Sequence, residues 1–436
     1  MTTTAHAPLR VALLGGGTVG SQVARILTED AAVLRDRVGA PLELAGIAVR
    51  TPDAPRDWQA DPALYTTDAE TLVDGADVVI ELMGGIEPAR TLIRRALEAG
   101  IAVVTGNKAL LAQHGEELYD LASRTGAQLS FEAAVAGAIP ILRPLRDSLA
   151  GDRVTRVMGI ANGTTNFILD RMDTEGASFE DALAEAQRLG YAEADPSADV
   201  GGDDAAAKAA ILATLAFGTS YTLDQVSVEG ITGITAADNE AATEAGYAIK
   251  LLAIAERVTA EDGTAGAILR VHPTLVPRQH PLASVHGAFN AVFVEAENAG
   301  ELMFYGPGAG GAPTASAVMG DTVAIAQRIV RGGPARLRTP VAALPALAPA
   351  EAHTSCLVVL RVADQPGVLR RVAAVFEDHG VSIETLRQVQ GADGPGASLR
   401  VITHRARQRD LDAVVAALGA LDVVHDVVSV LRVEGN

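Results

Sequence analysis

The stretch Leu9–Leu27, LRVALLGGGTVGSQVARIL, decides the fold of the N-terminal part of the chain. An apolar run ends at a cluster of glycines, and the apolar residues beyond them recur at helical spacing. The pattern Gly15-x-Gly17-x-x-Gly20 is typical of a strand, a tight turn and a helix whose N-terminal N–H groups face a pyrophosphate. The alternative is an ordinary tight turn. We predict a dinucleotide site made by Gly15, Gly17, Thr18, Val19 and Gly20.

Strand-like and helical runs alternate beyond this motif. The strand-like runs are LELAGIAV (42–49), DVVIEL (77–82), IAVVTGNK (101–108) and QLSFEAAVAG (128–137). Alternation of this kind favours a parallel sheet with helices on both faces. We predict an α/β domain of the Rossmann type over residues 1–148, completed by about 306–335, where a Gly-rich loop opens another helix.

The rest of the chain divides by pattern and composition. Strands broken by long helices predict an α+β domain with a mixed sheet over 149–320. Residues 332–351 hold four prolines among alanines, as a linker does. Residues 352–436 follow the order βαββαβ of a small ferredoxin-like module.

Composition narrows the class of protein. The 436 residues carry a net charge of −19, which argues against nucleic acid and anionic membranes as partners. The single cysteine, Cys356, fits a reducing cytoplasm, and MTTTAHAPLR has no apolar signal region. We therefore expect a cytoplasmic protein.

Two basic residues stand where cofactor contacts are expected. Arg50 follows the second strand, where a carboxylate usually holds the ribose of NAD, so an arginine favours the 2′-phosphate of NADP. Lys108 lies just past the end of a strand, the edge at which parallel sheets bind ligands. Either residue could instead be an ordinary surface side chain.

The stretch AQRLGYAEADPSADVGGDDAAAK (186–208) gathers carboxylates in front of a lysine. Asp204 and Lys208 are four residues apart and share one face of a helix. Apolar residues continue from Lys208 at helical spacing, so the lysine lies on the apolar side. Such a lysine can exchange a proton with a substrate oxygen, and Glu193 and Asp195 can receive an ammonium group. A structural ion pair next to an acidic loop is the alternative.

This stretch, together with NGTTNFIL (162–169), TGNKALLA (105–112) and GPGAG (306–310), resembles homoserine dehydrogenases of the monofunctional bacterial kind over nearly the whole chain. The resemblance implies reversible reduction of L-aspartate 4-semialdehyde to L-homoserine with NADPH or NADH. It implies that residues 149–320 form the catalytic and dimerisation domain, that Lys208 is the proton donor, and that Asp204 and Glu193 bind the amino-acid end. It places Lys108 between cofactor and substrate, and Gly190 and Gly310 beside the nicotinamide.

The resemblance also implies a monovalent cation, Na⁺ above all, held by main-chain oxygens of Val135, Gly137 and Ile139 and the region of Glu132. The C-terminal module resembles an ACT domain, which implies threonine as an effector and a homodimer or homotetramer. Its effector residues are expected at Asp364, Gly367, Val368 and Leu369, unless the module serves only oligomerisation. The main alternative function is a non-catalytic amino-acid sensor that binds NADP. An aspartate-semialdehyde dehydrogenase would need a cysteine nucleophile in its catalytic domain.

Overall fold

A computed structural model describes residues 6–333, 344–390 and 396–435. The chain forms two compact units, and each is described by itself. The first comprises Met1–Val157, Ala207–Gln225 and Phe289–Ala343, and the second comprises the remaining residues. Residues 334–343 of the predicted linker lie outside the described residues.

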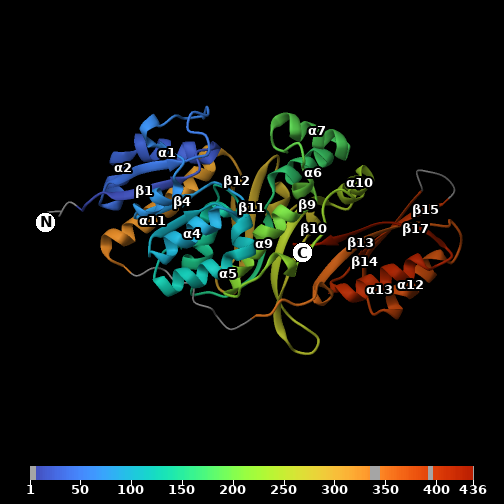
Figure 1. Cartoon of the computed structure of the whole chain (residues 1–436). Helices are drawn as coiled ribbons and strands as arrows, with labels where there is room; N and C mark the ends of the chain where they lie inside the picture. Colours follow the sequence, from blue (N-terminus) through green and yellow to red (C-terminus); the bar gives the residue numbers. More distant parts are fainter. Residues whose placement is uncertain (1–5, 334–343, 391–395, 436) are drawn as a thin grey trace. The chain divides into compact units, whose positions relative to one another are not determined.

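The first unit contains a parallel sheet of six strands in the order β3-β2-β1-β4-β5-β6. Figure 1 labels two of these strands, β1 and β4. Every neighbouring pair in it is parallel. The predicted parallel sheet is therefore confirmed. Its strands are β1 Leu9–Leu14, β2 Leu42–Ala48, β3 Tyr65–Thr66, β4 Val78–Glu81, β5 Ala102–Thr105 and β6 Leu129–Ser130.

Helices cover both faces of this sheet. One apolar core joins the sheet to α1 (Thr18–Glu29), α2 (Ala31–Val38) and α11 (Gly311–Arg331). A second core joins the opposite face to α3 (Ala69–Asp74), α4 (Ala89–Glu98) and α5 (Lys108–Thr125). Helix α11 thus comes from late in the chain to pack beside α1, as predicted from its Gly-rich start.

The prediction of a full strand over 128–137 is wrong. Only Leu129–Ser130 pair with β5, and the 3₁₀ turn η2 (Glu132–Ala134) follows. The cause is Glu132, whose buried carboxylate accepts hydrogen bonds from the main-chain N–H groups of Ile141 and Leu142 at 2.6 and 2.7 Å. These bonds satisfy a buried charge and turn the chain away from the sheet.

The second unit carries a mixed sheet and a layer of helices. Strands β9 (Tyr247–Thr259) and β10 (Ala265–Pro277) form a long antiparallel pair, and β8 (Val226–Val228) is parallel to β10. Its helices before the C-terminal module are α6 Gly163–Glu175, α7 Phe179–Leu189, α8 Ser197–Val200 and α10 Ala236–Glu244. The boundaries between the two units fall within β7 (Val154–Ile160) and within helix α9 (Asp203–Phe217). The first unit also contains an antiparallel pair of strands, β11 (Phe289–Ala296) and β12 (Gly300–Pro307).

The C-terminal module has the predicted order βαββαβ. Its elements are β13 His353–Val362, α12 Val368–Asp378, β14 Ile383–Gln390, β15 Ala397–Thr403, α13 Gln408–Gly419 and β17 Val424–Val433. Strand β17 lies beside β13, which lies beside β15 and then β14, and the short β16 (Ala406–Arg407) pairs with β13. Both helices pack on the sheet through one apolar core that includes Cys356. The buried thiol has its pKa raised to about 11 by desolvation.

Candidate active site

The glycine motif forms a tight turn between β1 and α1. Gly15 has a φ of +106°, and a Cβ there would lie 2.6 Å from the carbonyl oxygen of Leu82. A Cβ on Gly20 would lie 2.1 Å from the carbonyl oxygen of Gly15. A Cβ on Gly17, the N-cap residue of α1, would meet no atom within 4 Å. Two glycines thus close the turn, and the third leaves open space at the helix N-terminus, as a pyrophosphate would need.

The start of α11 lies against this turn. A Cβ on Gly311 would lie 3.0 Å from the carbonyl oxygen of Thr18. Gly310, the N-cap residue of α11, has a φ of +125°, which favours glycine. The structure therefore brings Gly310 next to the glycine turn, although they are nearly 300 residues apart in the sequence.

Arg50 is exposed and lies two residues beyond the end of β2. A second arginine, Arg56, lies beside the turn and was not among the predicted site residues. A Cβ on Gly16 would lie 3.1 Å from Nε of Arg56. The Arg56 guanidinium donates to the carbonyl oxygens of Thr51 and Pro52 at 2.7 and 2.8 Å. It also lies 4.4 Å from the centre of the Tyr65 ring. A role for Arg56 was hard to predict from the sequence, because this residue lies on an irregular segment after β2.

Lys108 is the first residue of α5, at the carboxyl end of β5. The N-cap residue Asn107 donates to the carbonyl oxygen of Gly85 at 2.6 Å and accepts from the N–H of Leu110 at 3.2 Å. Its own N–H donates to the hydroxyl of Thr105. These bonds fix the point at which α5 begins, and with it the position of Lys108.

A buried carboxylate links the ends of β4 and β5. Thr105 donates its hydroxyl hydrogen to Glu81 at 2.6 Å, and the N–H groups of Met83 and Gly84 donate to the other oxygen at 2.8 and 3.2 Å. Burial raises the pKa of Glu81, while these hydrogen bonds oppose the shift. The sequence analysis assigned Glu81 no role, although a carboxylate inside DVVIEL was a usable signal.

The second unit holds the acidic group of the long motif. Asn162, the N-cap residue of α6, donates through its side-chain amide to Asp199 at 2.7 Å and to Asp204 at 2.9 Å. Its side-chain oxygen accepts the N–H of Thr165 at 2.8 Å. Asn162 therefore caps one helix and holds two carboxylates from other segments. It was not among the predicted site residues.

Helix α9 carries Asp204 in its first turn and Lys208 one turn later. Both residues are 8% exposed, and Ile211 and Leu212 beyond them are almost fully buried. The prediction that Lys208 lies on the apolar side of this helix is confirmed. A buried ammonium group close to a carboxylate on the same helix is suited to proton exchange with a substrate oxygen.

The loop before α8 carries the remaining predicted residues of this group. Gly190 ends α7 in the left-handed conformation, with a φ of +78°. Glu193 is exposed, and its carbonyl oxygen accepts from the side chain of Gln187 at 3.1 Å. Asp195 instead accepts from the N–H of Ser197 at 3.1 Å, and the Ser197 hydrogen bonds lower the pKa of Asp195. Asp195 thus shapes the turn, whereas the carboxylate of Glu193 faces solvent.

The loop after η2 contains the residues predicted to hold a cation. Ala136 and Gly137 both have a φ of +57°, and Val135, Gly137 and Ile139 are buried. Among the described residues, no hydrogen bond is assigned to the main-chain oxygens of these three. Buried carbonyl oxygens are nearly always paired, so this loop fits a hard monovalent cation that prefers oxygen ligands.

The expected effector residues lie at the start of α12. Gly367 is its N-cap residue, with a φ of +93°. Asp364 and Leu369 are exposed, whereas the side chain of Val368 belongs to the core of the module. An effector at this position would therefore meet Val368 through its main chain.

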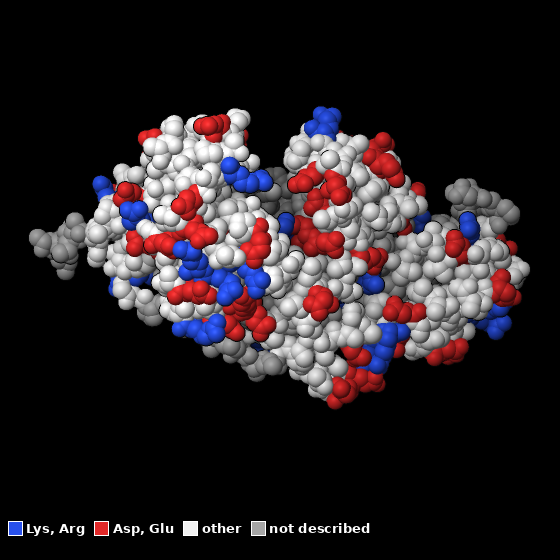
Figure 2. Space-filling view, viewed as in Figure 1, with Lys and Arg blue, Asp and Glu red and all other residues white. Residues whose placement is uncertain are grey.

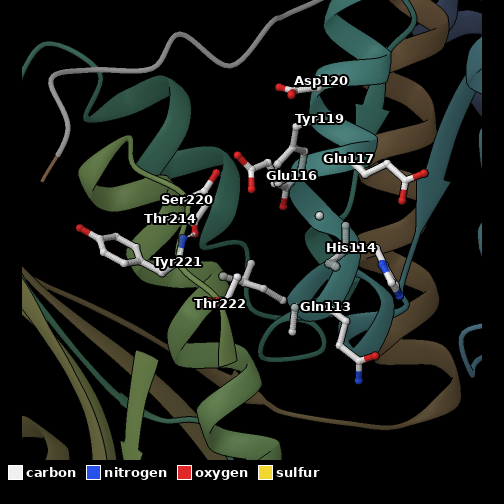
Figure 3. Close-up of a pocket in the computed structure, with 14 residues that line it drawn as sticks. Gln113, His114, Glu116, Glu117, Tyr119, Asp120, Thr214, Ser220, Tyr221 and Thr222 are labelled. Atoms are coloured by element: carbon white, nitrogen blue, oxygen red, sulfur yellow. Dashed lines mark hydrogen bonds between the residues drawn. The ribbon is translucent and has the colours of Figure 1, made fainter. Parts of the chain in front are cut away.

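A cavity of about 370 Å³ lies between α5 and the C-terminal part of α9 with the segment that follows it, and none of the predicted site residues lines it (Figure 3). Glu116, Asp120 and Ser220 lie around it, and the hydroxyl of Thr214 accepts the N–H of Tyr221 at 3.0 Å.

No helix among the described residues is long and apolar enough to span a membrane.

The parallel sheet, its glycine turn and the acid–lysine helix define a nicotinamide-dependent oxidoreductase. Comparison with known proteins gives the particular family. The profile described as "Homoserine dehydrogenase, NAD binding domain" matches residues 15–132, "Homoserine dehydrogenase" matches 140–323, and "ACT domain" matches 357–423. The chain belongs to the homoserine dehydrogenase family.

Individual relatives agree over nearly the full length. The homoserine dehydrogenase of Corynebacterium glutamicum is 54% identical over 97% of this chain and 95% of its own. That of Mycobacterium tuberculosis is 53% identical over 98% of each chain. A crystal structure of a homoserine dehydrogenase from Thiobacillus denitrificans superposes with a TM-score of 0.89, at 39% identity over 98% of each chain. The chain is therefore an oxidoreductase that interconverts aspartate 4-semialdehyde and homoserine, and the catalytic interpretation is favoured over the non-catalytic sensor.

Proposed function

We propose that Lys208 is the proton donor in the reduction of L-aspartate 4-semialdehyde to L-homoserine. The observation that carries this assignment is a buried lysine one helical turn from a carboxylate that Asn162 holds in place. When hydride reaches the carbonyl carbon, the electron pair of the C=O bond moves to oxygen. The Lys208 ammonium stabilises that negative oxygen and protonates it, giving the alcohol. In the oxidative direction the neutral amine takes the proton back.

Asp204 and Glu193 are proposed to receive the ammonium group of the substrate. Asp204 is buried and fixed by Asn162, so its orientation costs little when substrate binds. Glu193 is exposed and can approach a cation from solvent. Lys108, fixed at the start of α5, is proposed to contact both cofactor and substrate through its ammonium group.

The nicotinamide cofactor, when bound, supplies or accepts the hydride. We propose that Gly15, Gly17, Thr18, Val19 and Gly20 hold its pyrophosphate, and that Gly190 and Gly310 border its nicotinamide. NADP is favoured over NAD because Arg50 follows β2 and Arg56 lies beside the glycine turn. An archaeal homoserine dehydrogenase solved with NADPH, 28% identical over 76% of this chain at a TM-score of 0.62, supports this preference.

We propose that Val135, Gly137 and Ile139 hold Na⁺ through their main-chain oxygens, together with the main chain of Glu132. The side chain of Glu132 is already engaged by main-chain N–H groups, so it shapes the loop. The test compares the melting temperature in sodium chloride and in choline chloride at equal ionic strength. We expect a higher value in sodium, and equal values would exclude a stabilising cation.

Regulation and assembly are also proposals. The ACT domain is proposed to bind threonine near Asp364, Gly367, Val368 and Leu369, and the chain to form a homodimer or homotetramer. The domain boundaries at 1–148, 149–320, 332–351 and 352–436 and the cytoplasmic location stay predictions from the sequence.

A spectrophotometric assay tests these assignments together. Purified protein is given homoserine with NADP⁺ or NAD⁺ at mildly alkaline pH, and formation of reduced nicotinamide is followed with and without threonine. We expect faster turnover with NADP⁺ and a lower rate in threonine. Equal rates with both cofactors would reject the proposed preference, and an unchanged rate would reject threonine as the effector.

A further inference from the structure

The last residues of three neighbouring strands form one row at the carboxyl edge of the parallel sheet. Glu81 ends β4 and lies between Leu14, the last residue of β1, and Thr105, the last residue of β5. The strand order reverses between β1 and β4, because β2 lies on the other side of β1. A dinucleotide binds across such a point, with one half on each side. Glu81 therefore lies on the side where the nicotinamide half is expected, yet the proposed reaction assigns it no role.

The carboxylate of Glu81 joins the loop after β4 to the end of β5. One of its oxygens accepts the N–H groups of Met83 and Gly84 at 2.8 and 3.2 Å, and the other accepts the Thr105 hydroxyl at 2.6 Å. All three partners are donors, and a carboxylate, which only accepts, satisfies them together. The group thus holds the first residues of one loop against the strand that leads into the next.

Thr105 and Asn107 close these contacts into a ring. The Thr105 oxygen also accepts the N–H of Asn107 at 3.0 Å, and the Asn107 side chain donates to the carbonyl oxygen of Gly85 at 2.6 Å, back in the loop after β4. Asn107 is the N-cap residue of α5, and Lys108 is the first residue of that helix. The ring therefore fixes where α5 begins and where the main chain of Lys108 lies.

The loop after β4 also contacts the glycine turn. A Cβ on Gly15 would lie 2.6 Å from the carbonyl oxygen of Leu82, and the N–H of Leu82 donates to the carbonyl oxygen of Leu14 at 2.7 Å. Gly84 and Gly85 follow with φ of +72° and +73°, and a Cβ on either would meet no atom within 4 Å. The loop thus presents its main chain to open space at the edge of the sheet where the cofactor is expected.

The surroundings of Glu81 differ from those of the carboxylates on the neighbouring helices. Glu70, Glu98 and Glu117 each pair with an arginine of α4, and Figure 2 shows red and blue side chains interspersed over this region. Glu81 is 0% exposed and, within the part of the chain that the structure describes, forms no ion pair. Burial of a carboxylate without a basic partner costs free energy, which hydrogen bonds offset only in part. Stability alone therefore gives little reason for a carboxylate here.

We propose that Glu81 is a positioning residue for the dehydrogenase reaction. Through Thr105 and Asn107 it sets the start of α5, so that the Lys108 ammonium group meets cofactor and substrate in the arrangement that reacts. This role rests on the proposed contact of Lys108 with both molecules. Displacement of a reacting group by about 1 Å can slow an enzymatic step about 100-fold, so the loss of one link in the ring should be measurable.

A matched pair of variants at Thr105 tests the ring with little change in packing. Thr105→Val keeps the shape of the buried side chain and removes the hydroxyl, whereas Thr105→Ser keeps the hydroxyl and removes the methyl group. Thr322→Val is the control, because Thr322 is equally buried in the same unit and its hydroxyl donates within α11, to the carbonyl oxygen of Val318 at 2.9 Å. Steady-state kinetics, NADP⁺ affinity by fluorescence titration and melting temperature are measured for each variant.

We expect Thr105→Val to lower kcat/KM for homoserine by more than about fivefold and to weaken NADP⁺ binding, because both depend on the position of Lys108. Thr105→Ser should recover most of both losses. Thr322→Val should keep wild-type kinetics even if its melting temperature falls as far as that of Thr105→Val. The proposed role is overturned if Thr105→Val loses about fivefold or less. It is also overturned if Thr105→Ser or Thr322→Val loses as much as Thr105→Val.

A double-mutant cycle with Lys108→Met shows whether the ring acts through Lys108. Lys108→Met keeps the apolar stem and removes the ammonium group, so Thr105→Val should lower kcat/KM by less than about twofold in that background. Glu81→Ala is taken through the same cycle with the same expectation, and the Thr105 variants keep the test valid if Glu81→Ala does not fold. An equal loss in both backgrounds would overturn the role of Glu81 and leave that of Lys108 intact. Wild-type kinetics in Lys108→Met alone would reject the proposed role of Lys108, and that of Glu81 with it.

Discussion

The side-chain amide of Asn162 donates a hydrogen bond of 2.9 Å to the carboxylate of Asp204. The same amide nitrogen donates to Asp199, while the amide oxygen caps α6. Replacement of Asn162 by Ala removes all three contacts. We expect kcat/KM for homoserine to fall about 10- to 100-fold, because an unsatisfied, misoriented carboxylate costs about 1–3 kcal/mol. Steady-state kinetics with homoserine varied at saturating cofactor measure the change.

Asn162→Ser separates orientation of the carboxylates from helix capping. Serine still caps α6 and so protects the roughly 1 kcal/mol that an N-cap contributes, but it cannot reach both aspartates. We expect Asn162→Ser to recover most of the stability lost in Asn162→Ala and little of the activity. If activity recovers in proportion to stability, Asn162 acts only through the fold.

The glycine turn provides a matched pair of variants. Gly17→Ala places a methyl group in open space, so we expect a loss of about 1 kcal/mol from the poorer N-cap residue, with NADP⁺ binding weakened at least tenfold. Gly20→Ala places the methyl group 2.1 Å from the Gly15 carbonyl oxygen, so we expect it to lose about 3 kcal/mol or more. Chemical denaturation and fluorescence titration of the cofactor measure both effects. Unchanged cofactor affinity in Gly17→Ala would place the pyrophosphate elsewhere.

Arg50→Ala tests the preference for NADP. Loss of an exposed guanidinium that contacts the 2′-phosphate should raise KM for NADP⁺ about tenfold and leave KM for NAD⁺ unchanged. The ratio of kcat/KM for the two cofactors is the measurement, with Arg35→Ala as a control on the same unit. An equal effect on both cofactors would argue against a 2′-phosphate contact.

The buried carboxyl group of Asp321 should make the free energy of unfolding decrease as pH rises. Its carboxylate accepts the N–H of Glu132 at 2.7 Å, and burial raises its pKa to about 6, with the nearby Glu132 charge adding to the shift. The folded-state pKa lies above the unfolded value of 3.8, so the folded state binds more protons and this group destabilises the protein as pH rises from about 4 to 6. A shift of roughly two units corresponds to about 3 kcal/mol.

Asp321→Asn removes that titration. We expect the free energy of unfolding of the variant, relative to that of wild type, to increase by about 2–3 kcal/mol between pH 4 and pH 7, because only wild type loses stability there. Urea denaturation at a series of pH values measures the difference. A difference that stays constant across this range would show that Asp321 does not titrate there.

Much of the fold was predictable because local patterns agreed with the tertiary structure. The glycine motif lies between β1 and α1 as expected, and the βαββαβ order of the C-terminal module is present. Strand β9 was not predicted from the sequence. Its run from Ala248 to Ala255 is apolar except for Lys250, and such a run has no period that distinguishes a strand from a helix. Lys250 is tolerated there because Val285 and Asn166 accept its hydrogen bonds at 2.6 and 3.2 Å.

Site residues could be predicted from the sequence only where they lie close together on one segment. Asp204 and Lys208 share a helix, so their spacing alone indicated a role. The partners that position the site are remote in sequence. Asn162 is 42 residues from Asp204, and Thr105 is 24 from Glu81. Arg56 reaches the glycine turn through an irregular segment. Contacts of this kind depend on tertiary packing, which no local pattern encodes.

The central claim is that Lys208 transfers the proton, and Lys208→Met tests it most directly. Methionine keeps the length and apolar stem of the side chain and removes the ammonium group. We predict that kcat for homoserine oxidation falls about 10²- to 10⁴-fold while the Kd of NADP⁺ changes less than about threefold. Lys250→Met, which removes a buried lysine outside the predicted site, should lose stability and keep kcat within about tenfold. A folded Lys208→Met enzyme that retains kcat within about tenfold of wild type would contradict the account.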